Sequence, residues 1–175
     1  MLFCKEEKIK IASLDDAPAI TNLLNSAYRG ESSRKGWTTE ANIIAGDQRT
    51  TVEEIRGLIN PPSSVFLIYS EKITEGCVNL QQRDNKLYLG LFSVNPERQG
   101  KGIGKKLLHA SEKYAVSLGC DMIFMTVIDI REELINWYKK HGYVDTGARK
   151  RFEEDGVSGK HLQKLQFMVL EKNLH

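Results

Sequence analysis

The sequence predicts a mixed α/β fold in which helices flank a twisted, mainly antiparallel sheet. Three observations predict it. Short apolar runs rich in β-branched and aromatic residues recur between turn sequences. Segments with apolar residues at three- and four-residue steps lie among these runs. A glycine-rich basic turn at 94–106 joins one apolar run to one such segment. The chain of 175 residues suits one domain, expected to span 1–175.

The first half of the chain is expected to alternate short helices with strands. Asp15 or Asp16 is the expected N-cap of the first helix, because Pro18 then falls in its first turn. Thr38 or Thr39 is the expected cap of a second helix. The expected elements are a strand at 9–11, a helix from 14 with Ala19, Ile20, Leu23, Leu24 and Ala27 as its buried stripe, helices at 40–45 and 51–58, and strands at 65–69, 75–81 and 87–94.

The second half is expected to begin with a long amphipathic helix. Apolar residues recur from Ile103 to Leu118 at three- and four-residue steps, and Gly119 stands where a C-cap glycine is expected. A β-rich apolar run follows at 122–128. The remaining expected elements are a helix at 133–141, a strand beginning at Tyr143 or Val144, a loop at 155–159 and a last strand at 165–170.

Composition favours a small anionic ligand over nucleic acid or a membrane. The hydrophobic content of 41% and the charged content of 27% are those of a globular protein. The net charge of +2 is too small to indicate a polyanionic partner, and no apolar run approaches the roughly 18 residues of a membrane span. Residues 1–8 become charged too early for a signal peptide. Basic residues gather around the glycine-rich turn instead.

The cysteines predict neither a disulfide framework nor a metal site. Cys4, Cys77 and Cys120 are odd in number, widely spaced and without metal-ligand spacing. We therefore expect reduced thiols, no metal and a cytoplasmic protein. Cys120 lies beside an apolar strand and is expected to be a small core residue rather than a nucleophile.

The turn at 94–106 is the most informative segment. Its glycines remove side chains, so that backbone N–H groups can converge on an anion at a helix N-terminus. The Walker A pattern fails, because Gln99 stands where its first glycine is required, and the dinucleotide pattern lacks its third glycine. Residues 99–104 instead fit Gln-x-x-Gly-x-Gly, which resembles the acetyl-coenzyme A pyrophosphate loop of the GNAT N-acetyltransferase superfamily.

A second segment agrees with this resemblance. Residues 133–143 run through Tyr138 and basic residues to Gly142 and Tyr143, and they are similar to the superfamily's second signature. The two signatures lie in the superfamily's order, and the resemblance covers about residues 87–147. It implies the GNAT fold, with a central twisted, mainly antiparallel sheet flanked by helices.

The resemblance implies that acetyl-coenzyme A is the co-substrate. In the superfamily, the edge of the strand before the loop bonds the pantetheine arm, and the loop binds the pyrophosphate mainly through N–H groups. The implied cofactor-binding residues are Phe92, Ser93, Val94, Gln99, Gly100, Lys101, Gly102, Ile103, Gly104 and Lys105. Arg131 stands where many members have asparagine. It is a candidate cofactor contact and equally a candidate helix cap among Asp129, Glu132 and Glu133.

Tyr138 matches the superfamily tyrosine near the cofactor sulfur, which implies a general acid. Because a phenol has a pKa near 10, Tyr138 is protonated at neutral pH and can donate to a departing thiolate. The alternative interpretation is that Tyr138 is a core residue of an amphipathic helix and packs beside Ile135 and Trp137.

The resemblance places the acceptor near residues 28–40. Glu31, Trp37 and Glu40 are candidates to hold a cationic amine by carboxylate pairing and cation–π contact. Some superfamily members carry a glutamate base on the strand before the loop, but here that strand has no carboxylate. Glu31, Glu40 and Asp129 are therefore the candidate bases, and each is equally interpretable as a solvated surface charge.

The leading hypothesis is an N-acetyltransferase that moves an acetyl group from acetyl-coenzyme A to a primary amine of a small molecule. Direct attack in a ternary complex is the expected mechanism. One alternative is a protein or peptide amine as the acceptor, and another is a non-catalytic module that binds acyl-coenzyme A. A monomer or a homodimer is expected, with no nucleic acid or membrane as a partner.

Overall fold

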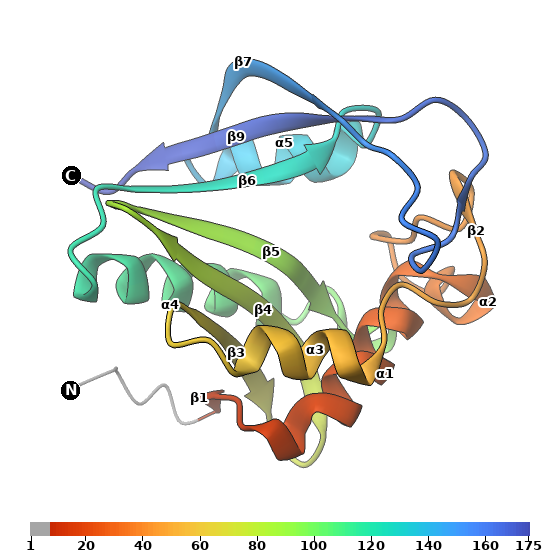
Figure 1. Cartoon of the computed structure of the whole chain (residues 1–175), viewed down its shortest axis with the longest axis horizontal. Helices are drawn as coiled ribbons and strands as arrows, with labels where there is room; N and C mark the ends of the chain where they lie inside the picture. The colour runs from red at the N-terminus through yellow and green to blue at the C-terminus, as the bar shows by residue number, and fades with distance from the viewer. Residues whose placement is uncertain (1–7) are drawn as a thin grey trace.

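The computed structural model of the protein describes residues 8–175 (Figure 1). Expectations for residues 1–7, including Cys4, lie outside the described residues. The elements are β1 (Ile9–Ile11), the 3₁₀ turn η1 (Leu14–Asp16), α1 (Ala17–Tyr28), α2 (Gly30–Ser33), β2 (Ile44–Ala45), α3 (Val52–Ile59), β3 (Ser64–Ser70), β4 (Thr74–Arg83), β5 (Lys86–Val94), the 3₁₀ turn η2 (Pro96–Arg98), α4 (Ile103–Ser117), β6 (Met122–Ile128), α5 (Glu132–Lys140), β7 (Val144–Arg151), β8 (Lys160–His161) and β9 (Gln166–Asn173).

One sheet of seven strands forms the centre of the fold, in the order β1-β3-β4-β5-β6-β9-β7. Neighbouring strands are antiparallel except for β5 and β6, which are parallel. A parallel pair needs a crossover connection, and α4 supplies it. The predicted mixed fold with a mainly antiparallel sheet is therefore confirmed.

Helices cover both faces of the sheet (Figure 1). On one face α4 and α5 contribute Leu107 and Ile135 to the larger apolar core. On the other face α1 and α3 pack around Ile55 and Phe66. Gly76 on β4 lets α4 approach closely, because a Cβ there would lie 2.8 Å from Leu107 Cδ1. The two cores fix the sheet between the helices and so fix the direction of β5.

The strands β5 and β6 diverge toward the glycine-rich turn (Figure 1). They pair only where Lys86–Tyr88 lies beside Met122–Phe124. Farther along β5 the register with β4 shifts, and Leu91 has a φ of +46°. An irregularity of this kind bends a strand away from its neighbour. The end of β5 therefore has one edge that β6 does not cover.

Residues 40–45 do not form the predicted helix. The Thr39 hydroxyl accepts the N–H of Ala41 at 3.1 Å, but the turn ends where the Ile44 N–H binds the carbonyl of Glu40 at 2.9 Å. Residues 44–45 then form β2, which pairs antiparallel with β8. The prediction was wrong because the hydrogen-bond partner of this segment lies far along the chain.

The ends of the other helices follow local chemistry. Thr51 accepts the N–H of Glu54 at 3.2 Å and caps α3. Asp16 is the N-cap position of α1, as predicted, but its carboxylate binds a backbone N–H of the preceding turn instead of the helix. Gly119 follows α4 with a φ of +72°, as a C-cap glycine does. Ala19, expected in the buried stripe of α1, is exposed.

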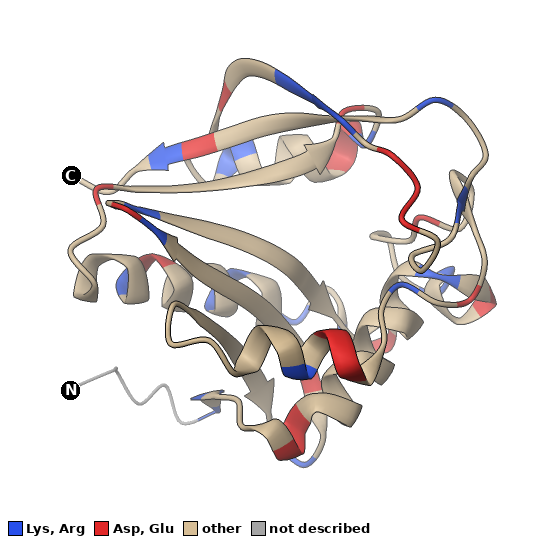
Figure 2. Cartoon of the chain, viewed as in Figure 1, with Lys and Arg blue, Asp and Glu red and all other residues tan. Residues whose placement is uncertain are grey.

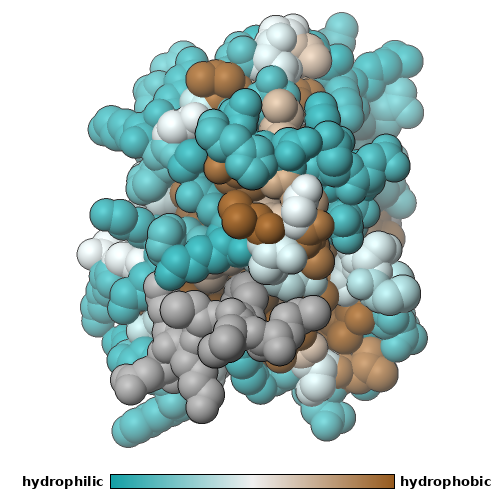
Figure 3. Space-filling model, turned by 90° about the vertical axis from the view of Figure 1, so that its left-hand side faces the viewer, coloured by the Kyte–Doolittle hydropathy of each residue, from teal (hydrophilic) through white to brown (hydrophobic). Residues whose placement is uncertain are grey.

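Charged residues lie around the molecule and are sparse on the central strands (Figure 2). The face shown in Figure 3 is mostly hydrophilic, with small separate hydrophobic patches. Within residues 8–175, no helix combines the length and the apolar character that crossing a membrane requires.

Candidate active site

The glycine-rich turn presents free N–H groups at the start of α4. Gly100 and Gly102 have φ values of +81° and +80°, and a Cβ at either position would meet nothing within 4 Å. Among the described residues, no acceptor binds the backbone N–H groups of residues 99–105. These N–H groups lie at the positive end of a helix of 15 residues. The turn thus combines open space, free donors and a helix dipole, which together suit an anion.

Gln99 holds the turn against the segment after α2. Its side-chain oxygen accepts the N–H of Trp37 at 2.9 Å, and its amide nitrogen donates to the Thr38 hydroxyl at 2.8 Å and to the Val94 carbonyl at 3.3 Å. Gly36 makes room for this amide, because a Cβ there would lie 2.6 Å from the Gln99 oxygen. The Gln99 side chain therefore fixes the turn, and its backbone N–H remains free.

The base of the turn is held by a partly buried ion pair. Arg98 Nε lies 2.5 Å from an oxygen of Glu75, which is 5% exposed. The Glu75 carbonyl also accepts the N–H of Asn95 at 2.8 Å. These contacts tie the turn to the start of β4, so the free N–H groups keep a fixed orientation.

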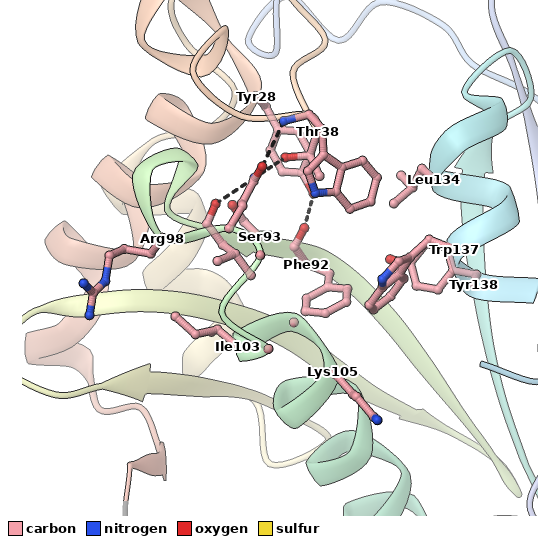
Figure 4. A pocket seen from close by; sticks show the side chains of 16 residues that line it. Tyr28, Thr38, Phe92, Ser93, Arg98, Ile103, Lys105, Leu134, Trp137 and Tyr138 are labelled. Carbon is pink, nitrogen blue, oxygen red and sulfur yellow. Dashed lines mark hydrogen bonds between the residues drawn. The ribbon is translucent and has the colours of Figure 1, made fainter. Parts of the chain in front are cut away.

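A first cavity of about 290 Å³ opens between the turn, the end of β5 and α5 (Figure 4). It brings together most of the predicted cofactor-binding residues, Trp37 and Tyr138. Its lining residues are Tyr28, Trp37, Thr38, Phe92, Ser93, Val94, Arg98, Gln99, Gly100, Gly102, Ile103, Gly104, Lys105, Leu134, Trp137 and Tyr138. Lys101 is exposed and does not line this cavity.

The free edge of β5 is partly occupied. The Tyr28 hydroxyl donates to the carbonyl of Phe92, which is one of the predicted cofactor-binding residues. Ser93 is 4% exposed, and its hydroxyl has no hydrogen-bond partner among the described residues although Ser93 lines the first cavity. A buried hydroxyl without a partner is costly. It is therefore available to a polar group bound in this cavity.

Tyr138 is 4% exposed and lies in a cluster of aromatic rings. Its ring centroid is 5.2 Å from that of Trp137, 5.8 Å from that of Tyr143 and 6.3 Å from that of Phe92. Burial raises the pKa of Tyr138 well above its usual value, and the neighbouring Tyr28 raises it further. Within residues 8–175 nothing hydrogen-bonds the Tyr138 hydroxyl. Tyr138 therefore fits part of each sequence interpretation. Its ring packs in the core, as a core residue does, and it also lines the first cavity, as a general acid would.

A second cavity of about 130 Å³ lies between the diverging strands β5 and β6. Its lining residues are Tyr28, Glu40, Arg49, Tyr88, Leu89, Gly90, Leu91, Phe92, Met125, Thr126, Val127, Ile128, Arg131, Leu134, Tyr138, Phe152 and Phe167. Tyr28, Phe92, Leu134 and Tyr138 line both cavities. The two cavities are therefore neighbours, and Tyr138 is in the lining of both.

Glu40 and Arg131 belong to a buried ionic cluster. The Glu40 carboxylate lies 2.5 Å from Arg29 Nη1 and 3.0 Å from Arg131 Nη1. Arg131 also donates to the carbonyl of Thr38 at 2.6 Å, and Arg29 to that of Ser158 at 2.7 Å. Arg131 thus lines the second cavity rather than the first, and its guanidinium does not cap α5 through any of the three nearby carboxylates.

The other predicted acidic residues lie away from both cavities. The Glu31 side chain is 90% exposed and pairs with Arg34 at 2.9 Å. Asp129 accepts a hydrogen bond from Gln166 at 2.6 Å. Neither residue lines either cavity. Of the three predicted acceptor residues, Trp37 lines the first cavity and Glu40 the second.

Sequence reasoning missed several residues of the two cavities. Tyr28 lies at the start of the segment 28–40 but was not among its predicted acceptor residues, and Arg49 lies in a polar stretch without a motif. Leu134 and Trp137 share the helical face of Tyr138, and that periodicity was the signal available for them. No sequence signal marks Arg49, because only the folded chain brings it to the diverging strands.

The described cysteines lie in the core. Cys77 and Cys120 are free and buried, and burial raises the pKa of each thiol. Neither thiol lines either cavity. Within residues 8–175, no three or more His, Cys, Asp or Glu side chains are grouped so that they could hold a metal ion.

Solved structures share this fold. The protein smu.2055 from Streptococcus mutans UA159 is 18% identical over 96% of this chain and 99% of its own, with a TM-score of 0.73. A second is yncA, a putative acetyltransferase from Salmonella typhimurium determined with its cofactor acetyl-CoA, at 20% identity, coverage of 95% and 93%, and a TM-score of 0.66. The ribosomal-protein-S18-alanine N-acetyltransferase from Escherichia coli has a TM-score of 0.71 at 11% identity, with coverage of 95% and 93%.

A family sequence model identifies the family of this chain. The sequence model of the acetyltransferase (GNAT) family matches residues 17–143, which include the glycine-rich turn, the diverging strands and Tyr138. This match confirms the resemblance found in residues 87–147, and it extends that resemblance to α1 and the segment after it. The family consists of acyltransferases that use acetyl-coenzyme A. The chain therefore belongs to the acetyltransferase (GNAT) family.

Proposed function

We propose that this protein transfers an acetyl group from acetyl-coenzyme A to the primary amine of a small molecule. One observation carries the proposal: residues of the glycine-rich turn and Tyr138 line the same cavity, and Tyr138 also lines a second cavity beside it. The first cavity suits acetyl-coenzyme A, because the turn at one end can bind an anion and because Tyr138 can donate a proton. The second cavity suits the acceptor.

The residues of the first cavity fit acetyl-coenzyme A, which supplies an acetyl thioester. The N–H groups of residues 99–105 and the Lys105 ammonium would bind the pyrophosphate. The Ser93 hydroxyl, which lacks a partner among the described residues, would bond the pantetheine arm along β5. The rings of Trp37 and Trp137, 6.5 Å apart between centroids, would pack on its apolar parts.

Tyr138 would act as the general acid. When the amine nitrogen bonds the acetyl carbon and the carbon–sulfur bond breaks, Tyr138 donates its proton to the departing sulfur. The tyrosinate then takes up the proton that the acylated nitrogen loses. The raised pKa of Tyr138 keeps the phenol protonated throughout the neutral range, so that it is ready to donate.

Direct transfer to the amine needs no acyl-enzyme. An acyl-enzyme route requires an activated nucleophile beside the thioester. The described cysteine thiols are buried outside both cavities, and burial raises their pKa, which disfavours the reactive thiolate. The lining residues that the two cavities share support attack in a ternary complex. The second cavity, at about 130 Å³, is below the usual size of a drug-binding pocket and favours a small acceptor.

The Tyr138→Phe variant tests this assignment. It keeps the ring and its packing and removes the proton donor. We expect thiol release from acetyl-coenzyme A with an accepted amine to slow by at least about tenfold, within the range for one general acid. Acetyl-coenzyme A affinity should be unchanged. The chain has only two tryptophans and both line the first cavity, so their emission reports this binding directly.

Two controls separate chemistry from binding. Gly102→Asp places a charged side chain in the open turn and should weaken acetyl-coenzyme A binding while the fold is retained. A Tyr138→Phe rate within a factor of two of wild type, with chemistry rate-limiting, would remove Tyr138 from the acid role. Normal binding by Gly102→Asp would contradict the assignment of the turn. Transfer to peptides but to no small amine would favour the alternative acceptor class.

A further inference from the structure

The second cavity carries positive charge that its own residues do not neutralise. Its charged lining residues are Glu40, Arg49 and Arg131. The Glu40 carboxylate is already shared between Arg131 and the fully buried Arg29. One carboxylate therefore stands among three guanidinium groups. Excess charge in a partly buried space favours a ligand of the opposite sign.

The backbone of Arg49 is fixed in place, and its guanidinium forms no hydrogen bond or ion pair among the described residues. Its backbone N–H donates to the Asn25 side chain at 2.6 Å, and the next residue, Thr50, donates to the same oxygen at 3.0 Å. The capped helix α3 begins directly after this clamp. Arg49 is half-buried, and among residues 8–175 no acceptor or carboxylate binds its guanidinium. A rigid backbone thus presents an unpaired guanidinium to the cavity.

The nearby acidic groups form no ion pair with the Arg49 guanidinium, although Asp155 lies within its electrostatic reach. Burial alone would raise the pKa of Asp155, but hydrogen bonds from Ser158 and Val157 and, more weakly, the charge of Arg49 lower it. Glu40 is held by its two arginines. The Asp155 carboxylate accepts the N–H groups of Val157 and Ser158 at 2.8 and 2.7 Å and the Ser158 hydroxyl at 3.0 Å, and it is not part of the cavity lining. Arg29 Nη2 is itself buried without a hydrogen-bond partner among the described residues. The cluster next to the cavity is therefore short of acceptors as well as of negative charge.

We propose that the acceptor is an amine that also carries an oxyanion, a carboxylate or a phosphate, and that Arg49 binds this oxyanion while the amine faces Tyr138. The proposal rests on the acetyl transfer proposed above and names its acceptor class. A guanidinium presents paired donors that match carboxylate and phosphate oxygens. The apolar lining, which includes Leu89, Val127 and Phe167, would pack on the rest of a small acceptor. This acceptor is selected through its anionic group, whereas Glu31 and Glu40 were expected to select an acceptor through its cationic amine.

Binding without acetyl-coenzyme A gives the first test. Calorimetry would compare matched probes: L-amino acids with aliphatic, aromatic and polar side chains, each against its α-amide, and O-phosphoethanolamine against ethanolamine. We expect the anionic member of at least one pair to bind at least about tenfold more tightly, as loss of a charged hydrogen bond implies. The amino-acid pairs report a carboxylate site, and the phosphoethanolamine pair reports a phosphate site.

Variants then test whether Arg49 causes the preference for the anionic probe. Arg49→Gln should abolish the preference for the anionic probe, and Arg49→Glu should reverse it. Arg56→Gln is the matched control, because Arg56 is an exposed arginine on α3 outside both cavities. It removes the same charge from the protein and should keep the preference. The acetylation rates of the paired amines should follow the same order through KM.

The outcomes separate this proposal from the acetyl transfer on which it rests. Transfer to neutral and anionic amines at equal kcat/KM would leave the acetyltransferase assignment standing and overturn the oxyanion site. Absence of acetyl-coenzyme A binding would overturn the transfer reaction, while calorimetry would still decide the oxyanion site. No preference in any pair, including no binding of any probe, would overturn the proposal. A preference that survives in Arg49→Gln would also overturn it.

Discussion

Glu31 and Glu40 were predicted to share a role, but they lie in opposite environments. The Glu31 side chain is 90% exposed and forms one surface ion pair. The Glu40 side chain is 10% exposed and binds two arginines. A surface pair contributes little to stability, whereas removal of one partner from a buried pair leaves an uncompensated charge. The protonated amine that both were expected to bind would have to compete with Arg29 and Arg131 at Glu40.

The same substitution at the two positions should therefore have different effects. Glu40→Gln leaves the two arginines without their common counter-charge, and we expect it to lower the free energy of unfolding by about 3–5 kcal/mol. Glu31→Gln should change it by less than about 0.5 kcal/mol. Urea unfolding of both variants measures the difference. Equal stabilities would mean that the cluster around Glu40 contributes no more than a surface pair.

The short strands β2 and β8 lie beside the wall of the second cavity. Ile44 on β2 packs with Ile128 and Leu165 in a third apolar cluster, which contacts Phe152 and Phe167 of the second cavity. Gly159 stands beside this pairing with a φ of +109°, and a Cβ there would lie 2.4 Å from the Ala45 carbonyl oxygen. The close approach of these two segments therefore depends on a position without a side chain.

Gly159→Ala should separate these segments. Gly156→Ala is its control, because Gly156 also has a positive φ, +76°, but a Cβ there would meet nothing within 4 Å. Both variants should carry the cost of a left-handed alanine, roughly 1–2 kcal/mol, and Gly159→Ala should lose more. We expect Gly159→Ala to impair amine kinetics while acetyl-coenzyme A affinity is retained. Indistinguishable melting temperatures and kinetics in the two variants would contradict the role of Gly159 in the close approach of β2 and β8.

Buried phenols connect the site to the stability of the whole protein. Tyr138 and Tyr143 are 4% and 1% exposed, and burial raises the pKa of both well above the usual value. Tyrosines in the unfolded chain titrate near pH 10. Because the folded pKa values are raised, the unfolded chain loses protons first as the pH rises. The stabilisation is complete below pH 10 and is lost progressively above it.

Alkaline unfolding should reveal this linkage. We expect the free energy of unfolding to be nearly constant with respect to these phenols up to about pH 9 and to fall above pH 10, by about 1.4 kcal/mol per pH unit for each buried phenol. Tyr143→Phe removes one of these groups and should reduce the slope. Urea unfolding at pH values from 8 to 11 measures it. An unchanged slope in the variant would show that Tyr143 is not linked to folding.

Local patterns predicted much of the fold, and most of the residues they singled out as cofactor-binding line one cavity. The glycine-rich turn and α5 each follow a contiguous sequence pattern, and apolar runs rich in β-branched and aromatic residues predicted the long strands. The helix expected at 40–45 failed because a two-residue strand is too short for a period, and its pairing with β8 depends on distant residues. The roles of Arg49 and of Glu40 likewise depend on partners brought close only by folding.

The two cavities draw on different parts of the chain, and this division bears on how the substrate range of such a protein changes over evolution. Much of the lining of the first cavity comes from residues 92–105 and from one turn of α5. The charged lining of the second cavity comes from Glu40, Arg49 and Arg131. Phe152 and Phe167 form its far wall. With the function proposed above, mutations at Arg49 and at the far wall are expected to alter which molecule is acetylated and to leave acetyl-coenzyme A binding unchanged. Tyr138 lines both cavities, so a substitution there is expected to affect both at once.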